Sequence, residues 1–400
     1  MKEGWTYKKL GEVCEVTDFV ANGSFATLRQ NVTYYNEPNY AILVRLADYS
    51  SNFDKSKFVY VDEHSYNFLS KSSLKGGEII MSNVGSIGKC FLCPKLSDHM
   101  TIGPNSLLIN TPNNEYFLYY FRSETFQKDL LSITSSATLS KFNKTQLKTL
   151  TIPLPSLSEQ QRIVSRLDAA FSHIDELKAN AEKQLSEARA LFQKSLAKAM
   201  KPKEGWKEKK LIEITHEKCP ISYGIVQQGN HIDGGVPVVR PVDMREKYIT
   251  RENLKCTTQT ISDSYKRTIL RGDELLLSVR GTTGIISLAT PELKGCNVNR
   301  GIVPLYFKDQ FNKDFLYYEM VSPILQSVFA EKTTGSTLKQ INIKDLRLIK
   351  LSIPPNSEQQ RIVERLDALS AHVRELEENQ KKIISECDAL KQALLRKVFE

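Results

Sequence analysis

Two long stretches of the chain place apolar residues at alternating intervals of four and three residues. They span residues 158–200 and 357–400, and neither contains glycine or proline. In the second stretch only Gln380 interrupts the apolar series, which runs Ile362, Leu366, Leu369, Val373, Leu376, Ile383, Cys387, Leu390 and Leu394. This spacing is the heptad pattern of a helix packed lengthwise on another helix. The alternative, two separate surface helices, would leave both apolar stripes uncovered.

Prolines directly upstream of both helices end the preceding strands and mark where each helix begins. We expect Ser158 and Ser357 to cap the first turns, and Gln161 and Gln360 to close capping boxes. At about 1.5 Å per residue, each helix is expected to be roughly 65 Å long. The residues predicted for the helix seam or for contact with a partner protein are Gln161, Arg162, Leu167, Leu177, Gln360, Arg361, Leu366 and Leu376.

Shorter apolar runs precede each long helix and favour β-strands. The predicted strands cover residues 40–45, 78–82, 106–109, 237–240, 274–278 and 302–306, with helices at 116–131 and 313–330. The predicted fold class is α+β, with two globular parts of mixed α/β structure, each followed by a long helix.

The chain is one module written twice. Residues 158–169 and 357–368 are identical at eleven of twelve positions, and the match continues over 158–200 and 357–399 at 23 of 43 positions. Weaker repeats precede it, such as Glu3-Gly4-Trp5 with Glu204-Gly205-Trp206 and Thr138-Leu139 with Thr337-Leu338. The expected domains are 1–157, helix 158–200, 201–356 and helix 357–400.

Composition narrows the class of protein without identifying it. Hydrophobic residues make up 40% and charged residues 25% of the chain, and no run of 18 apolar residues occurs. These values exclude collagen-like and wholly disordered chains and favour a protein that is neither exported nor membrane-spanning. Seven scattered cysteines favour reduced thiols in the cytoplasm. Cys90 and Cys93 have the spacing of a zinc knuckle, but no second pair exists, so we expect buried thiols and no metal.

The net charge of +9 is concentrated in one region. Residues 201–356 carry +7, residues 1–157 carry +2, and the two helices carry +1 and −1. A basic globular domain with polar, glycine-containing loops suits a phosphate backbone, whereas neutral helices with heptads suit protein contacts.

The usual enzyme motifs are missing. The sequence has no phosphate-binding loop of the Gly-x4-Gly-Lys type, no Gly-x-Gly-x-x-Gly fingerprint and no Asn/Asp-Pro-Pro-aromatic box for amino methylation of a base. The six histidines are isolated, and His173 and His372 occupy equivalent helix positions. We therefore expect no catalytic residue and no metal site in this chain, although a self-sufficient nuclease and a helical scaffold or adaptor that binds no nucleic acid stay open as alternatives.

The duplicated order of domain and helix, with Ile152-Pro-Leu-Pro-Ser-Leu-Ser-Glu-Gln-Gln-Arg162 and Ile353-Pro-Pro-Asn-Ser-Glu-Gln-Gln-Arg361 at the junctions, resembles the specificity subunit of type I restriction-modification enzymes. The resemblance implies that each globular part is a target-recognition domain that reads one half of a bipartite DNA sequence. It implies an antiparallel pair of spacer helices with pseudo-twofold symmetry, which docks two methyltransferase subunits. The resemblance also implies endonuclease subunits that translocate DNA and join the complex. S-adenosylmethionine, ATP and Mg²⁺ then belong to the partners, as does catalysis.

Within the domains, the resemblance points to polar loops after a strand, Ser82-Asn83-Val-Gly85-Ser86-Ile-Gly88 and Ser278-Val-Arg280-Gly281-Thr282-Thr283-Gly284. Glycines there let the backbone approach DNA closely, but a tight turn held for folding explains them equally well. The recurring pairs Arg45/Asp48 and Arg240/Asp243 form either an internal ion pair or a DNA contact. The candidate DNA-binding residues are Asn83, Ser86, Lys89, Lys141, Arg240, Arg280, Thr282, Thr283 and Lys339. An antiparallel helix pair would also bring Glu400 beside Met1.

Overall fold

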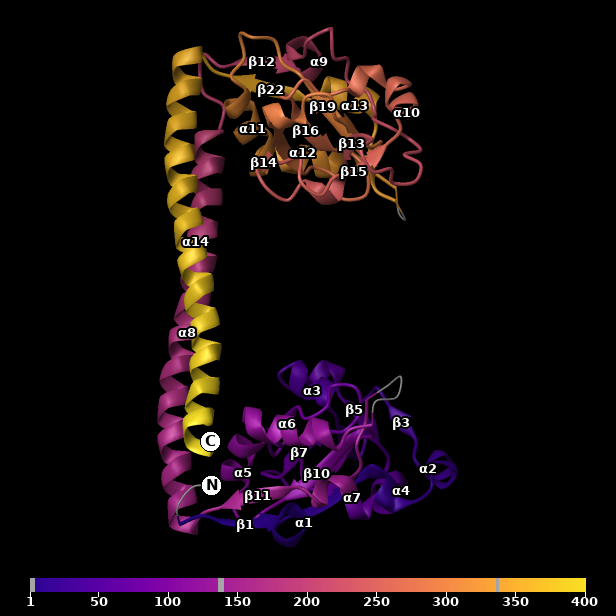
Figure 1. Ribbon diagram of the computed structural model, residues 1–400. Helices are drawn as coiled ribbons and strands as arrows, with labels where there is room; N and C mark the ends of the chain where they lie inside the picture. The colour runs from indigo at the N-terminus through magenta and orange to yellow at the C-terminus, as the bar shows by residue number, and fades with distance from the viewer. Residues whose placement is uncertain (1–3, 136–139, 336–337) are drawn as a thin grey trace. The chain divides into compact units, whose positions relative to one another are not determined.

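The computed structural model describes residues 4–135, 140–335 and 338–400 (Figure 1). The chain divides into two compact units, Met1–Ala181 with Lys381–Glu400, and Glu182–Gln380. Each unit therefore combines one globular domain with parts of both long helices, α8 (Leu157–Ala199) and α14 (Asn356–Phe399). The two helices begin and end within one residue of the limits that the apolar pattern predicts.

Two sheets form the globular part of the first unit. One has the strand order β2-β10-β7-β8, with bounds Glu15–Asp18, Ser106–Asn110, Ile79–Ser82 and Cys90–Leu92. The other has the order β3-β5-β4-β9-β6, with bounds Tyr34–Tyr35, Val59–Val61, Ala41–Val44, Met100–Ile102 and Ser73–Leu74. Strand β10 pairs antiparallel with both β2 and β7, and β4 pairs parallel with β9. A separate ladder joins β1 (Thr6–Lys9) to β11 (Thr151–Leu154), close to the start of α8.

The second unit repeats this plan with the same central pairings. The order β14-β17-β16-β19 has the bounds Tyr248–Ile249, Ile286–Ala289, Leu275–Ser278 and Ile302–Leu305. The order β15-β13-β18 has the bounds Lys255–Thr257, Val236–Val239 and Asn297–Val298. Strand β12 (Lys207–Lys210) pairs with β22 (Lys350–Ile353), as β1 does with β11, and a short hairpin joins β20 (Thr333–Thr334) to β21 (Gln340–Ile341). The six predicted strands all exist and correspond to β4, β7, β10, β13, β16 and β19.

The single helices predicted over 116–131 and 313–330 are wrong, because each is two helices. The first pair is α5 (Asn114–Phe121) and α6 (Glu124–Ser132), and the second is α11 (Lys313–Val321) and α12 (Pro323–Lys332). A serine separates the members of each pair, and its hydroxyl accepts a backbone N–H as the cap of the second helix. The remaining short helices are α1 (Leu10–Val13), α2 (Phe25–Asn31), α3 (Leu46–Ser50), α4 (Glu63–Phe68), α7 (Lys144–Lys148), α9 (Leu211–Ile214), α10 (Gln259–Asp263) and α13 (Ile343–Leu348).

The helix pair is antiparallel in both units, as predicted. In the first unit Lys391 pairs with Asp175, and Lys178 pairs with Asp388 at 2.8 Å. In the second unit Arg189 pairs with Glu377 at 2.7 Å. As residue numbers rise along α8, the numbers of their partners on α14 fall, which only antiparallel helices allow. Gln184 and Gln380, polar residues that interrupt the heptads of α8 and α14, hydrogen-bond to each other at 3.0 Å.

The predicted helix caps are wrong. Ser158 and Ser357 lie inside the first turns, and Ser156 caps α8 by accepting the Glu159 N–H at 3.3 Å. The glutamines that matter are Gln160 and Gln359, which are buried and donate to the carbonyls of Pro155 and Pro354. Gln161 and Gln360, predicted for capping boxes, are exposed.

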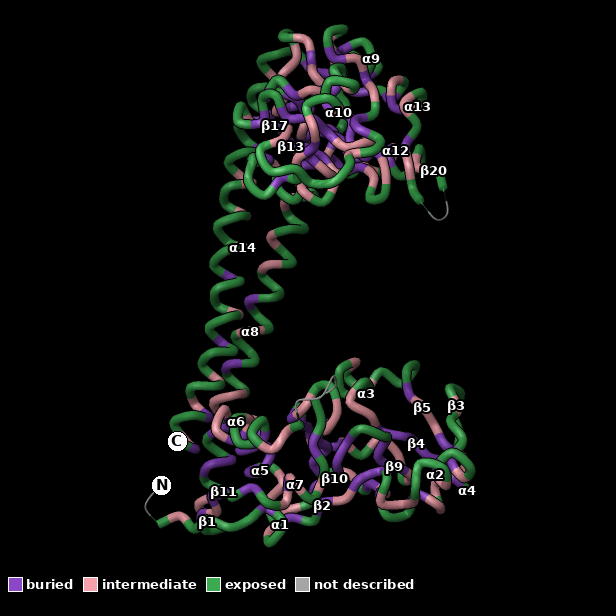
Figure 2. The backbone as a smooth tube through the Cα atoms, turned by 45° about the vertical axis from the view of Figure 1, so that its right-hand side comes forward, coloured by how far each residue is buried: buried purple, intermediate pink, exposed green. Residues whose placement is uncertain are grey.

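The four leucines predicted for the helix seam or for contact with a partner fall into two groups. Leu167 and Leu366 are buried, but they pack into the core of their own globular domain. Leu177 and Leu376 are 57% and 46% exposed, so neither lies in the seam. Buried positions recur at intervals along otherwise exposed helices in Figure 2, and on the far part of α14 they include Gln380 and Cys387.

Each core also takes residues from the end of the other helix. In the first unit Leu395 and Phe399 of α14 are buried with the aromatic residues of α5, and the Phe399 ring centre lies 5.4 Å from that of Tyr120. In the second unit Leu196 of α8 and Met200 are buried in the same way. Met1 lies outside the described residues, so its predicted position beside Glu400 is not visible. Trp5 packs against the core that holds Leu395 and Phe399.

The thiols of Cys90 and Cys93 are buried, as predicted for strand cysteines. Burial raises the pKa of Cys90 to about 11 and that of Cys93 to about 12, so both remain protonated thiols at neutral pH. Among the described residues, no helix has the length and apolar character needed to cross a membrane.

Candidate nucleic-acid interface

The glycine-containing loop of the first unit follows β7 and is held on both sides by backbone hydrogen bonds. The N–H of Asn83 donates to the carbonyl of Asn105 at 3.2 Å, and the Asn83 carbonyl accepts from the Phe142 N–H at 3.2 Å. Across the turn, the Gly88 N–H donates to the Ser82 carbonyl at 3.0 Å. Gly85 and Gly88 have φ of +76°, which L side chains rarely adopt, so this turn requires glycine.

The loop after β16 in the second unit repeats the three backbone hydrogen bonds that hold the first loop. Val279 N–H donates to the Gly301 carbonyl at 2.7 Å, and the Val279 carbonyl accepts from Ile341 at 2.9 Å. Gly284 N–H closes the turn on Ser278 at 2.9 Å. The sequence allowed two roles for these glycines, a tight turn held for folding or close approach to DNA. The tight turn is present in both copies, and it holds the exposed tip of the loop in a fixed position.

A glutamine side chain, on α6 in the first unit and on α12 in the second, holds the end of each glycine loop by hydrogen bonds. Gln127 on α6 donates to the carbonyls of Gly88 and Phe121 at 3.2 and 2.6 Å. Gln326 on α12 donates to the carbonyls of Gly284 and Met320 at 2.9 and 2.8 Å. Sequence reasoning missed both residues, although they recur at the same offset of 199 as the long helices.

A hairpin lies against each loop. In the first unit Val84 bridges to Lys141 and Ser135 bridges to Lys141, and in the second unit Arg280 bridges to Gln340. Lys141 and Lys339, predicted to meet phosphate, are exposed in these hairpins beside the glycine loops. Each loop and its hairpin thus form one surface. Thr138, Leu139 and Thr337, which belong to a predicted repeat, lie outside the described residues.

The side chains predicted to bind DNA from the loops differ in their exposure and in their hydrogen bonds. Ser86 and Thr282 are exposed, whereas the Thr283 hydroxyl is hydrogen-bonded to that of Thr333 at 2.9 Å. The Asn83 amide donates to the Phe142 carbonyl at 3.0 Å, and its Oδ1 is buried without a partner among the described residues. Asn83 therefore holds the hairpin, and its side chain does not project from the surface.

Arg240 forms the internal ion pair that the sequence offered as the alternative to a DNA contact. Its Nη2 lies 2.8 Å from Asp243 Oδ1, and Arg45 pairs with Asp48 in the same way at 2.7 Å. Each aspartate also accepts the backbone N–H of its arginine. The pair fixes the turn after β4 and β13, which accounts for its recurrence.

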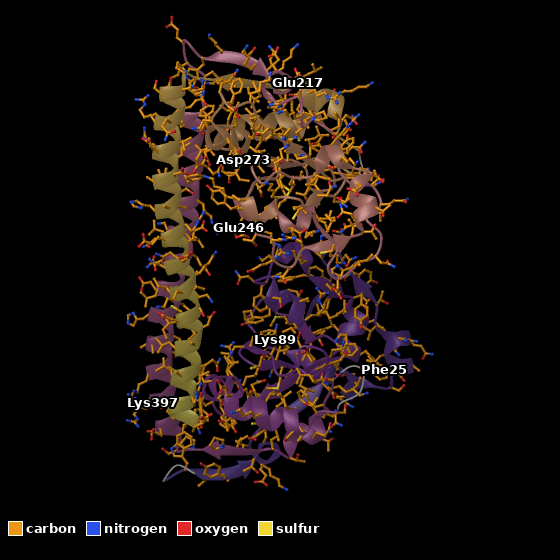
Figure 3. The ribbon with its side chains drawn as sticks, turned by 45° about the horizontal axis from the view of Figure 1, so that its top comes forward. Phe25, Lys89, Glu217, Glu246, Asp273 and Lys397 are labelled. Atoms are coloured by element: carbon orange, nitrogen blue, oxygen red, sulfur yellow. The ribbon has the colours of Figure 1, made fainter. Side chains whose placement is uncertain are left out.

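Lys89 directly follows the first glycine loop. It is exposed, and it lines a groove of about 740 Å³ between the first domain and the helix pair of the same unit, together with Arg122, Gln127 and Lys391. Figure 3 labels Lys89 and Phe25; Phe25 begins α2 and is 75% exposed.

The twelve-residue repeat is the junction between each domain and its helix. The Tyr119 hydroxyl donates to Asp168 at 2.5 Å, and the Tyr318 hydroxyl donates to Asp367 at 2.5 Å. Burial and the hydrogen bond to aspartate raise the pKa of both tyrosines, so both hydroxyls keep their protons. Sequence reasoning missed these tyrosines, although the same four residues, Phe-Leu-Tyr-Tyr, occur at 117–120 and 315–318.

The second junction has an additional cation. The Lys247 ammonium lies 2.9 Å from Asp367 Oδ1 and above the rings of Tyr317 and Tyr318. Burial lowers the pKa of Lys247, but the hydrogen bond and charge of Asp367 outweigh burial and hold that pKa above its ordinary value. Lys247 therefore stays charged and anchors the second domain to α14.

Two mixed α/β domains that carry matched loops, each docked on a long helix, define a duplicated recognition protein. The profile of the family described as type I restriction modification DNA specificity domain matches residues 2–187 and 203–386. The chain belongs to this family.

Similar proteins are type I restriction enzyme specificity subunits. The EcoBI subunit of Escherichia coli is 25% identical over 66% of this chain, and the matched region spans 61% of that protein, less than two thirds of its length. The MjaX subunit of Methanocaldococcus jannaschii, itself named as putative, is 26% identical over 92% of this chain and 87% of that protein.

Two solved structures share the fold over the whole chain. One comes from a structural description of complex assembly and conformational transition in a type I R-M system. It has a TM-score of 0.73 and 21% identity, and the match covers 98% of that chain. The HsdS subunit from Thermoanaerobacter tengcongensis has a TM-score of 0.54 and 21% identity, with 97% of that chain covered.

Proposed function

We propose that this chain is the DNA-reading subunit of a type I restriction-modification complex, in which each globular domain recognises one half of an asymmetric bipartite target. The observation that carries this proposal is the pair of glycine loops. The backbone hydrogen bonds that hold each loop in place correspond between the copies, while the residues at their tips differ: Val84 and Ser86 in one copy, Arg280 and Thr282 in the other. One scaffold with two different reading surfaces suits two different half-sites.

The helices are proposed to dock two methyltransferase subunits. Leucines that the heptads predicted for the seam are exposed instead, and they form two similar sets. Leu177 on α8 lies at the level of Leu390 on α14 in the first unit, and Leu191 lies at the level of Leu376 in the second. Each set offers one exposed leucine from each helix, which suits apolar contact with a partner. Two identical partners then find two similar surfaces.

The chain itself is proposed to be non-catalytic. S-adenosylmethionine is expected in the methyltransferase subunits, and ATP and Mg²⁺ are expected in restriction subunits that join the complex. In this proposal the chain only binds double-stranded DNA and places the target adenines before the enzymes.

The test is the adenine methylome of cells that express the chain together with the methyltransferase subunit of its own system. We expect methylation at one bipartite, asymmetric motif that disappears when this chain is deleted. A methyltransferase that methylates the same motif without this chain would contradict the proposal. So would cleavage of DNA by the purified chain alone with Mg²⁺, which would favour the nuclease alternative.

A further inference from the structure

Arg280, at the tip of the second glycine loop, differs from the arginines that stabilise the fold. It is half-buried, and its Nε is buried without a hydrogen-bond partner among the described residues. Arg280 also makes no ion pair with any residue that the structure describes, whereas Arg45 and Arg240 each pair with an aspartate. A donor buried without an acceptor costs stability, so an arginine that makes no bond within the fold is expected to be kept for contact with a ligand through its remaining donors.

The backbone around Arg280 is fixed on both sides. Val279 is bonded to Gly301 and Ile341, and the Gly281 N–H donates to the Lys339 carbonyl at 2.9 Å. With Nε covered, the guanidinium stem is restricted and the two terminal amino groups are the accessible edge. A planar fork held in one place suits bidentate recognition, whereas a phosphate contact needs only a flexible charge.

The surroundings leave room for a base edge. Gly281 has φ of +79°, and a Cβ added there would meet no atom within 4 Å, so the surface beside Arg280 is open. The exposed neighbours Thr282 and Lys339 are polar. In the first unit the position of Arg280 is taken by Val84, which has no donor, so the first loop lacks this fork.

We infer that Arg280 reads a guanine in the major groove of the second half-site, by donating from its two terminal amino groups to guanine O6 and N7. This inference rests on the proposed function. It assigns specificity at one base pair of one half-site to one side chain, and it predicts no corresponding arginine contact in the first half-site.

The experiment compares the methylomes of wild type, Arg280→Met and Arg280→Lys, each expressed as the full chain with its methyltransferase subunit. Methionine keeps the apolar stem, and lysine keeps the charge but loses the fork. For both variants we expect one guanine position of the second half-site to relax, with roughly ten- to hundredfold less discrimination there, while every other position stays as in wild type. Lys339→Met is the matched control, and it should weaken methylation of all sequences alike.

Two results would overturn the inference. The first is a wild-type second half-site without guanine. The second is an Arg280→Met variant that keeps full specificity, whether its binding is unchanged or is uniformly weaker with a salt slope reduced by about 0.9, the signature of a phosphate contact. Failure of the proposed function is distinguishable from these results, because the wild-type complex would then show no bipartite motif.

Discussion

The domain–helix junction and the glycine loop are both repeated in this chain, but they are repeated in different ways. At the junction the residues themselves recur. Gln160 and Gln359 each donate to the equivalent proline carbonyl, Asp168 and Asp367 each accept a tyrosine hydroxyl, and Leu167 and Leu366 are both buried in a domain core. At the loop the backbone bonds recur while the exposed side chains change. The difference separates a surface that must fit one fixed partner, its own helix, from a surface that we propose meets a different half of the DNA target in each copy.

The largest effect on stability is expected from Leu366, which occupies the same kind of position in the heptad pattern as the exposed Leu376. Leu366→Ala removes a side chain that is 1% exposed in the core of the second unit, and we expect the unfolding free energy to fall by about 2–5 kcal/mol. Urea denaturation followed by fluorescence measures this change. Trp206 reports on the second unit when the other tryptophan is replaced in a Trp5→Phe background.

The matched control is Leu376→Ala, ten residues along the same helix and 46% exposed. We expect it to change stability by less than about 0.5 kcal/mol and to weaken assembly with the methyltransferase. Equal destabilisation by the two substitutions would contradict this prediction and indicate that Leu376 lies in the helix seam.

A buried acid in the second domain gives a pH-dependent difference between the copies. Glu319 is 2% exposed, and it stands where the first domain has Tyr120 at the offset of 199. Burial raises its pKa to about 8, although its Oε1 accepts the Ser352 N–H at 2.5 Å. A raised pKa of an acid means that the neutral form stabilises the fold, and this contribution is lost as pH rises from about 4.5 through 8.

Glu319→Gln should remove this loss. We expect the unfolding free energy of the second unit to fall by up to about 4 kcal/mol between pH 5 and 9 in the wild-type chain and to vary much less in the variant. Urea titrations at both pH values, followed by Trp206 in the same background, measure the difference. Parallel pH profiles for the two proteins would show that Glu319 is not the titrating group.

The smallest expected effect concerns salt. Residues 201–356 carry +7 and residues 1–157 carry +2, so the second domain is expected to make more phosphate contacts. Each contact adds about −0.9 to the slope of log K against log salt. Once the motif is known, binding of the full complex can be measured on duplexes that carry a single half-site. The slope of log K against log salt should be steeper for the second half-site than for the first. Equal slopes would mean that net charge does not report on the contact surface.

The sequence predicted the long helices to within a residue, because they lack glycine and proline and keep a sustained period. It could not distinguish Leu167 and Leu366, which the structure buries in the domain cores, from Leu177 and Leu376, which are exposed, because all four occupy apolar positions of the same heptad pattern. It also missed the break between α5 and α6, where Ser123 caps a new helix inside an apolar run. The partners Gln127 and Gln326 act across long sequence distances, and only their matching offsets in the two copies pointed to them.

The central claim is that each domain reads its own half of the target. The most direct measurement replaces residues 201–356 with the corresponding domain of a family member that has a different target. Both helices are kept, and Lys247 and Tyr318, which contact Asp367, are retained at their equivalent positions in the grafted domain. The adenine methylome of the complex is then compared with that of the wild type. We predict that the second half of the motif changes while the first half and the spacing stay the same. A simultaneous change in both halves would contradict the account.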